Sequence, residues 1–138
     1  MTTCNNKFIL GLTLITGLLF TLGCDKLSTQ DAGILEGKIS IGPICPVETD
    51  PPDPACLPTV ETYKAYPVAV WTPDGRRKIT LLEPSLDGSY KTDFEPGKYL
   101  LILETGGINI GSSNLPVEVI IISGEMTTLN IDIDTGIR

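Results

Sequence analysis

Two thiols and three carboxylates share one proline-rich segment, Gly42 to Pro58, which holds six of the 11 prolines of the chain. Cys45 and Cys56 stand 11 positions apart in it. In an exported chain such a pair indicates a disulfide, and closing a loop of about 12 residues contributes up to ~3 kcal/mol. A metal site is the alternative, but two thiols without histidine or further cysteines fall short of a zinc shell. We predict a Cys45–Cys56 disulfide and no metal.

The same segment carries Glu48, Asp50 and Asp53. Calcium needs about six to eight converging oxygens, and the spacing of these acids lacks the EF-hand pattern. Proline stiffens the backbone and a disulfide holds both ends, so the loop would lose little entropy on binding a partner. We therefore expect a binding surface at Pro51, Pro52 and Asp53. The alternative is a structural cap over one end of the fold.

A second group of acids, Asp132 and Asp134, has the two-residue spacing of one strand face. Such a pair could serve acid–base chemistry or hold a cation, although alternation of this kind is more often the solvated face of a strand. The chain has no histidine, which removes the commonest general base, the usual triads and His-containing zinc sites. We predict no catalytic residue, no cofactor and no enzymatic activity, with a carboxylate-based hydrolase as the remaining alternative.

Trp71, the single tryptophan, has the opposite parity to Val68 and Val70, so it faces away from their side of a strand. An exposed tryptophan could stack on a sugar or anchor a protein partner. It could equally cover the other sheet or a loop. We add Trp71 to the candidate binding surface.

The first 23 residues have the character of a targeting segment. Lys7 precedes 13 apolar residues, 8–20, which fit a secretory h-region and are short of the ~18 expected for a membrane-spanning helix. Residues 21–24, TLGC, resemble the lipobox of bacterial lipoproteins, in which the cysteine is acylated by chains such as palmitate and the preceding residues are removed. Thr21 departs from the usual aliphatic residue. The resemblance implies a signal peptide over 1–23 and lipidation of Cys24. An ordinary secretory peptide or an uncleaved anchor is the alternative.

The length and the net charge limit the number of domains and the partners that the protein can have. The 138 residues allow one domain, and the apolar fraction of 41% excludes a disordered chain. The net charge of −7 argues against a nucleic-acid partner. Without Lys7, 9 bases face 17 acids, a net charge of −8, so lipid rather than electrostatics must hold the chain at an anionic membrane. The tether over 24–32 would span about 15 Å.

Seven runs rich in Val, Ile, Thr, Tyr and Leu alternate between turn signals and predict an all-β domain over 33–138. The strands are expected at 34–41, 66–72, 78–82, 90–94, 98–104, 117–122 and 127–134. The residues expected to face inward are Tyr66, Val68, Val70, Tyr90, Thr92, Phe94, Tyr99, Leu101, Leu103, Val117, Val119, Ile121, Thr127, Leu129, Ile131 and Ile133. Seven short strands on one core predict an antiparallel Greek-key sandwich.

Residues 66–104 resemble the prealbumin-like, or carboxypeptidase-regulatory-like, β-sandwich. The matching features are a V-x-V strand, a D-G turn, a D-G-x-Y strand and a P-G-x-Y strand; they lie at 68–70, 74–75, 87–90 and 96–99. The loop GPICPV at 42–47 and the ending DTGIR at 134–138 resemble a group of small uncharacterised bacterial exported proteins. These resemblances imply a fold and an exported location, and the sandwich is usually an accessory or interaction module.

Together these observations predict a lipid-anchored extracytoplasmic β-sandwich that acts as a non-catalytic binding module at the bacterial cell envelope. Its partners would be the membrane, through the lipid on Cys24, and an envelope protein or glycan. The sequence leaves the inner and the outer membrane as alternatives. The rival interpretation is a purely structural envelope protein without a dedicated ligand.

Overall fold

A computed structural model describes residues 31–138 of the chain, except 48, 106 and 108. The signal peptide predicted over 1–23, the lipidation of Cys24 and most of the tether over 24–32 lie outside the described residues. Within the described part, no helix is long and apolar enough to cross a membrane.

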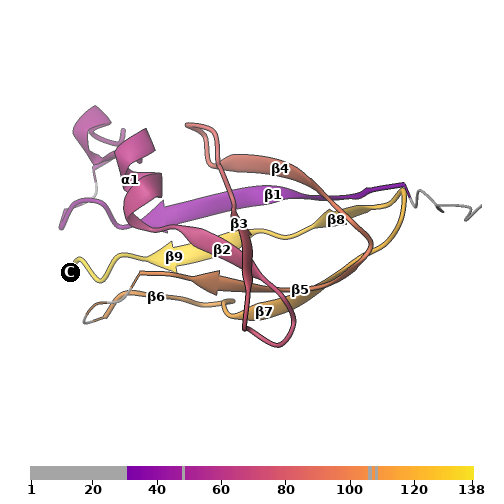
Figure 1. Cartoon of the computed structure of the whole chain (residues 1–138). Helices are drawn as coiled ribbons and strands as arrows, with labels where there is room; N and C mark the ends of the chain where they lie inside the picture. Colours follow the sequence, from indigo (N-terminus) through magenta and orange to yellow (C-terminus); the bar gives the residue numbers. More distant parts are fainter. Residues whose placement is uncertain (1–30, 48, 106, 108) are drawn as a thin grey trace, which may run out of the picture.

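In the described part of the chain, nine strands form two sheets that pack face to face (Figure 1). The first sheet has the order β4-β1-β9-β6, with β8 also paired to β1, and the second has the order β3-β2-β5-β7. The strands are β1 (Gly33–Gly42), β2 (Val68–Trp71), β3 (Lys78–Leu81), β4 (Ser89–Phe94), β5 (Gly97–Leu103), β6 (Gly111–Ser112), β7 (Val117–Ile121), β8 (Met126–Thr128) and β9 (Ile131–Asp134).

Two short helices interrupt the link from β1 to β2. They are the 3-10 turn η1 (Pro54–Cys56) and the helix α1 (Val60–Ala65). The sequence prediction missed both, since six residues are too few to display a helical period. The N-cap of α1 is Thr59, whose hydroxyl accepts from the Thr62 N–H while the Thr62 hydroxyl accepts from the Thr59 N–H. This reciprocal pair is a capping box built from two threonines rather than from threonine and glutamate.

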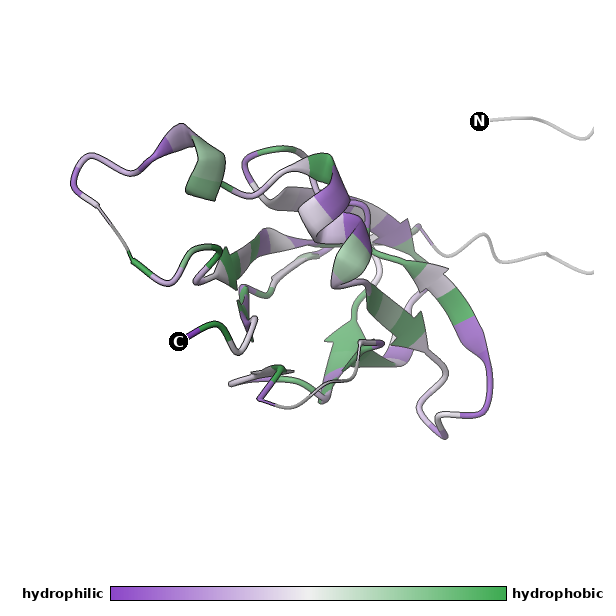
Figure 2. Cartoon of the chain, turned by 90° about the vertical axis from the view of Figure 1, so that its left-hand side faces the viewer, coloured by the Kyte–Doolittle hydropathy of each residue, from purple (hydrophilic) through white to green (hydrophobic). Residues whose placement is uncertain are grey.

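The inner faces of both sheets meet in one core, and the alternation read from the sequence identified part of it. Leu35, Val68, Val70, Leu101 and Ile131 are fully buried. All the residues expected to face inward are buried or partly buried, and Leu35 joins them without having been assigned from the pattern. Figure 2 shows hydrophobic residues along the strands of both sheets. An all-β sandwich is therefore the architecture of the described residues.

The expected count of seven strands and their purely antiparallel pairing were wrong. The last predicted strand is divided into β8 and β9, and both run parallel to β1. At the division the Leu129 N–H donates to the Glu36 carbonyl, and the Asn130 side chain accepts from the Lys38 N–H. A Cβ on Gly37 would lie 1.8 Å from the Leu129 carbonyl oxygen, so only glycine allows this close approach. The two-residue strand β6 was also missed.

The parallel pairing follows from a change of sheet. The turn after β7 was expected to lead into the last strand of an antiparallel sandwich. Instead it carries the chain from the second sheet to the first, where β8 enters beside the start of β1. The chain is fixed there because Ser123 Oγ donates to the Asp31 carbonyl at 2.8 Å and the Gly124 N–H donates to the Ala32 carbonyl at 3.2 Å.

Candidate functional site

The two ends of the sandwich differ in how they are closed. At the N-terminal end, defined by Asp31 and the turn at 123–125, the closing segments are short. At the disulfide-loop end, defined by residues 42–58, a long loop leaves β1 and returns through α1 to β2 (Figure 1). Strand β1 runs from one end to the other, and its 10 residues span about 33 Å.

The predicted disulfide is confirmed. The Cys45 and Cys56 sulfurs are bonded, with their Cα atoms 5.5 Å apart. Beside it, the Asp53 carboxylate accepts from the Ala55 N–H at 2.9 Å and caps η1. Thr49 Oγ1 donates to the Pro51 carbonyl at 3.0 Å. The loop is thus closed by a covalent bond and ordered by its own local hydrogen bonds.

The surface of the loop combines exposed apolar side chains with the exposed carboxylates of Asp50 and Asp53. Val47 is 72% exposed and Leu57 48% exposed, and Pro51 and Pro52 also face solvent. Figure 2 shows this segment projecting beyond the body of the sandwich. Pro52 contributes, with six neighbours in the loop, to a hollow of about 260 Å³; the others are Ile44, Cys45, Thr49, Asp53, Cys56 and Leu57. Of the four residues predicted as a binding surface, the consecutive Pro51, Pro52 and Asp53 are exposed on this loop, and Pro52 and Asp53 line the hollow.

A second apolar groove adjoins this end, where α1 approaches the end of β3. Its volume is about 380 Å³, and Val60, half exposed, forms part of its wall with Leu81. The remaining lining residues are Tyr63, Lys64, Pro67, Leu82, Glu83 and Pro84. Burial raises the pKa of the Tyr63 hydroxyl, with a smaller contribution from the Asp87 carboxylate. The sequence analysis missed this groove because it depends on the helix that the pattern did not indicate.

Trp71 does not belong to the same surface. It is the last residue of β2 and leads into the hairpin to β3, so the structure separates it from Pro51, Pro52 and Asp53. Its side chain is half-buried rather than freely exposed, and its indole N–H is buried without a hydrogen-bond partner among the described residues. The half-buried position of Trp71 is closer to the alternative of a side chain that covers part of the fold than to a freely exposed anchor.

Asp134, one of the two carboxylates predicted as a pair on β9, does not have the environment of an acid–base group. The Arg138 guanidinium donates to both oxygens of Asp134, at 3.1 and 2.7 Å. The Asp134 carboxylate also accepts from the Gly136 N–H at 2.8 Å. These bonds, led by the one from Arg138, lower the pKa of Asp134 to about 2. A general acid needs a raised pKa, so this environment disfavours that role at neutral pH.

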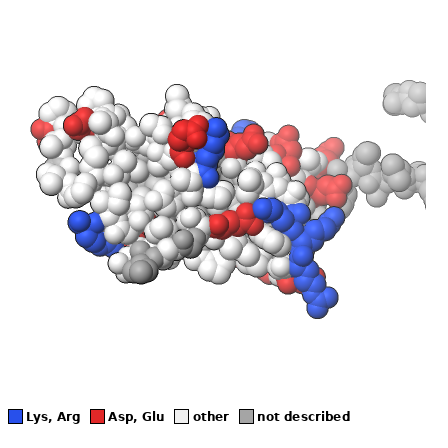
Figure 3. Space-filling model, turned by 60° about the vertical axis from the view of Figure 1, so that its left-hand side comes forward, with Lys and Arg blue, Asp and Glu red and all other residues white. Residues whose placement is uncertain are grey.

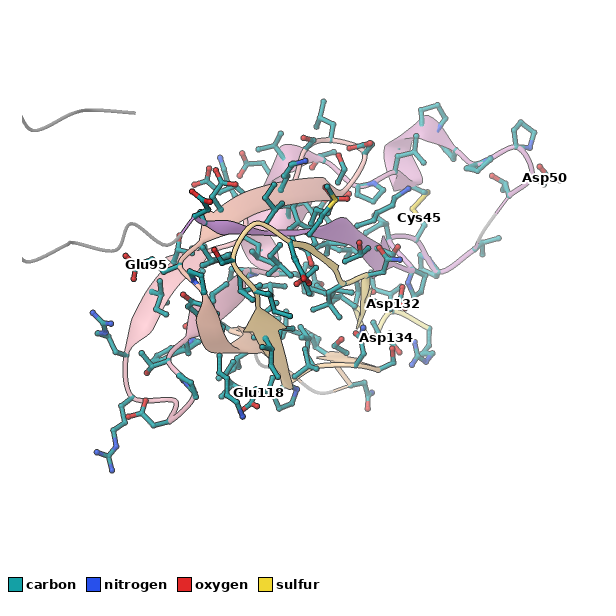
Figure 4. All side chains as sticks on the ribbon, turned by 90° about the vertical axis from the view of Figure 1, so that its right-hand side faces the viewer. Cys45, Asp50, Glu95, Glu118, Asp132 and Asp134 are labelled. Atoms are coloured by element: carbon teal, nitrogen blue, oxygen red, sulfur yellow. A yellow bond between two sulfur atoms is a disulfide. The ribbon has the colours of Figure 1, made fainter. Side chains whose placement is uncertain are left out.

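Acidic side chains are spread over the molecule instead of converging. Figure 4 shows Asp50 on the projecting loop, Asp132 and Asp134 near Cys45, and Glu95 and Glu118 toward the other end. Among the described residues, which exclude Glu48, no three or more Asp, Glu, Cys or His side chains are grouped closely enough to hold a metal ion. On the face shown in Figure 3, acidic and basic groups are interspersed, apart from a protruding basic cluster.

Comparisons with known proteins bear on the fold. No family model and no curated protein matches the chain. Among solved structures, the minor pilin GBS52 of Streptococcus agalactiae matches with a TM-score of 0.50 and 13% identity, over 76% of this chain and 45% of that chain. The Bacillus anthracis TIE protein matches with a TM-score of 0.46 and 10% identity, over 75% of this chain and 16% of that chain.

A DUF3823 family protein from Parabacteroides merdae matches with a TM-score of 0.44 and 16% identity, over 75% of this chain and 46% of that chain. The chain thus spans less than half the length of each of these three proteins. At such identities the likeness to the minor pilin shows the fold alone. It agrees with a β-sandwich domain of a kind present in bacterial proteins.

Proposed function

We propose that the chain is a lipid-anchored, non-catalytic binding module held outside the cytoplasm, whose disulfide loop engages a protein partner of the bacterial cell envelope. The observation that carries the proposal is the placement of the loop that exposes Val47 and Leu57 at the opposite end of the sandwich from Asp31, where the tether would enter (Figure 1). A lipid on Cys24 would hold the N-terminal end near the membrane and direct the loop away from it.

The dimensions agree with this orientation. The flexible tether over 24–32 spans about 15 Å, and β1 adds about 33 Å between the two ends. The loop would therefore stand a few tens of Å above the lipid headgroups. At that height it could meet another envelope protein without competition from the bilayer.

The prealbumin-like character of the sandwich is part of the proposal. The D-G pairs stand at the turns that the resemblance assigns to them, with Gly75 and Gly88 at positive φ of 66° and 84°. The Asp87 carboxylate accepts from both the N–H and the hydroxyl of Ser89, and these bonds lower the pKa of Asp87. Such turns support an accessory module of this kind, which commonly presents loops rather than catalytic groups.

The chemistry of the loop favours a protein over a glycan. Exposed Val47 and Leu57 and the flanking prolines supply apolar area on a preshaped backbone, and apolar anchors of this kind bind protein surfaces with little loss of entropy. Sugar recognition would be expected to use an accessible aromatic ring. Trp71 is half-buried and lies away from the loop.

Photo-crosslinking in the native envelope tests the proposal. A photoreactive side chain replaces Val47 in the loop, and the matched control replaces Met126, which is 55% exposed and lies at the N-terminal end. We expect a discrete protein adduct from position 47 and none of the same size from position 126. Adducts only with glycan, equal adducts from both positions, or no adduct from either would contradict the proposal; the last result would favour a purely structural protein.

A further inference from the structure

The turn between β7 and β8 carries exposed apolar side chains on both sides. Ile120 is 55% exposed and Ile122 50% exposed before the turn, and Met126 is 55% exposed after it. The Glu125 N–H closes the turn by donating to the Ile122 carbonyl at 3.1 Å, and the Thr127 hydroxyl donates to the Ile120 carbonyl at 3.3 Å. These bonds hold the two strand ends together, so the three side chains belong to one corner of the sandwich, which we call the apolar corner.

The apolar corner lies where the tether would enter the domain. Ser123 Oγ, in the turn, donates to the Asp31 carbonyl at 2.8 Å. The Ile34 N–H, at the start of β1, donates to the Glu125 carbonyl at 2.8 Å. Figure 1 shows the passage from β7 to β8 beside the start of β1. The first described residues of the chain are therefore fixed to the turn that carries the apolar corner.

A short tether favours a bilayer as the occupant of this corner. A flexible chain over 24–32 spans about 15 Å, so a lipid on Cys24 would hold the corner within reach of the headgroups. Such a tether raises the effective concentration of the bilayer at the corner, and a contact too weak to form alone becomes populated. Other exposed apolar side chains, such as Val47 and Leu57, belong to the disulfide-loop end, which is about 33 Å away along β1.

The charges around the apolar corner suit zwitterionic headgroups. Asp31 and Glu125 are exposed, and neither forms an ion pair with any described residue. Their carboxylates attract the ammonium groups of phosphatidylethanolamine, whereas an anionic surface repels them. Lys98, on the neighbouring strand β5, is paired with Glu118 at 3.2 Å. The exposed arginines at 76 and 77 belong to the β2–β3 hairpin, at the opposite edge of the second sheet.

We propose that the apolar corner inserts into the surface of the bilayer that carries the lipid anchor, with Ile120, Ile122 and Met126 among the headgroups and upper acyl chains. Apolar side chains of interfacial segments are buried about 5–10 Å deep in this region. The contact is a second point of attachment beside the lipid on Cys24, and it turns the domain so that the disulfide loop points away from the membrane. The inference rests on the lipid anchor of the proposed function and adds an orientation to it.

Fluorescence quenching on vesicles tests the contact. The full chain is produced in a bacterium that exports it, purified in detergent and reconstituted into vesicles of phosphatidylcholine and phosphatidylethanolamine whose acyl chains carry a nitroxide quencher. A fluorophore is attached through Glu125→Cys in the turn. The matched control is Glu83→Cys, an exposed glutamate in the groove beside α1. We expect quenching at position 125 to be at least about fivefold stronger than at position 83, because only an inserted turn reaches the acyl chains.

Polar variants of the apolar corner supply the second arm. In the Glu125→Cys background, its three side chains are changed together, as Ile120→Ser, Ile122→Ser and Met126→Ser. Quenching should fall at least about threefold, because the corner has lost the apolar area that enters the bilayer. The control Ile79→Ser, Leu81→Ser removes two side chains of β3 that are 41% and 40% exposed. It should leave quenching within about 1.5-fold of the parent, and circular dichroism checks that both variants are folded.

The outcomes separate this inference from the proposed function. A chain that does not float with the vesicles has no anchor, which contradicts the proposed function and this inference together. A chain that floats but is quenched equally at positions 125 and 83, or whose triple variant is quenched like the parent, overturns this inference alone. Equal quenching is also the result expected if the corner binds a protein instead of lipid, because the purified chain carries no partner.

Discussion

The two ends of the sandwich are closed by different means. At the N-terminal end, short turns are held by hydrogen bonds, such as those from Ser123 and Gly124 to the carbonyls of Asp31 and Ala32. At the disulfide-loop end, a covalent bond between Cys45 and Cys56 closes a long segment that exposes Val47 and Leu57. The comparison teaches that the residues of the N-terminal end are engaged in the hydrogen bonds that fix their own turns. The disulfide-loop end exposes apolar side chains that the core does not bury.

The largest expected effect concerns the disulfide. The double variant Cys45→Ser, Cys56→Ser should lower the free energy of unfolding by about 3 kcal/mol, because the unfolded chain regains the entropy of an open loop of about 12 residues. Urea denaturation monitored by tryptophan fluorescence measures it. As a control, a reductant should destabilise the parent protein and leave the variant unchanged. A loss below about 1 kcal/mol would mean that the loop end is held without its crosslink.

The next effect concerns Tyr90, whose buried hydroxyl donates to the Leu129 carbonyl at 2.6 Å. Tyr90→Phe should cost about 1–2 kcal/mol, because this carbonyl loses its partner. Tyr66→Phe, at a half-buried tyrosine near the disulfide-loop end, serves as the control for removing a hydroxyl. Urea denaturation of both variants at neutral pH gives the comparison, and equal losses would contradict the role assigned to Tyr90.

Alkaline pH sharpens the same test. Burial raises the pKa of Tyr90 from 10.0 to about 12. Between these values the unfolded chain releases the Tyr90 proton and the folded protein retains it, so stability is complete below pH 10 and decreases as the pH rises toward 12. We expect the parent to lose up to about 2–3 kcal/mol more than Tyr90→Phe over this interval. Parallel pH profiles of the two proteins would show that burial does not raise this pKa.

A smaller effect is expected at the cap of α1. Thr59→Ala removes the hydroxyl that accepts from the Thr62 N–H, and should cost about 1 kcal/mol. Thr59→Ser retains the hydroxyl and is the matched control. Amide hydrogen exchange should show faster exchange confined to α1 in the alanine variant. Equal exchange in both variants would mean that packing of Tyr63, rather than the cap, holds the helix in place.

The smallest effect concerns the C-terminal ion pair. Arg138→Gln should raise the pKa of Asp134 from about 2 toward the usual value near ~4. The pair stabilises the fold above the unfolded pKa, and that contribution is lost as the pH falls toward 2. Because both groups are exposed, stability at neutral pH should barely change. Carbon NMR titration of the carboxylate measures the pKa, with Lys64→Gln as a control; an unchanged midpoint would contradict the assignment.

Much of the fold could be predicted from local patterns. Inward alternation identified core residues such as Tyr90 and Leu101, and the D-G pairs located tight turns, because both signals act between neighbours in sequence. The division of β8 from β9 was not predicted, because it depends on the close approach of Gly37 to Leu129, two residues that are far apart in the sequence. The parallel pairing likewise follows from the change of sheet after β7, which the alternation of residues within a strand does not indicate.

The candidate site was predicted in part for the same reason. Two cysteines in a proline-rich segment identified the disulfide loop, and Pro51, Pro52 and Asp53 lie together in it. Trp71 was grouped with them by residue type, without any information on its place in space. Its half-buried position depends on how β2 packs within its sheet, so parity alone could not decide its exposure.

The most direct test of the account is the intact mass of the chain extracted from native membranes, with and without reduction before thiol alkylation. The account predicts a mass for residues 24–138 plus acyl chains, with two alkyl groups gained only after reduction. That result would establish a chain held by lipid at one end and closed by a disulfide at the other. A mass without lipid, or alkylation of Cys45 and Cys56 before reduction, would contradict it.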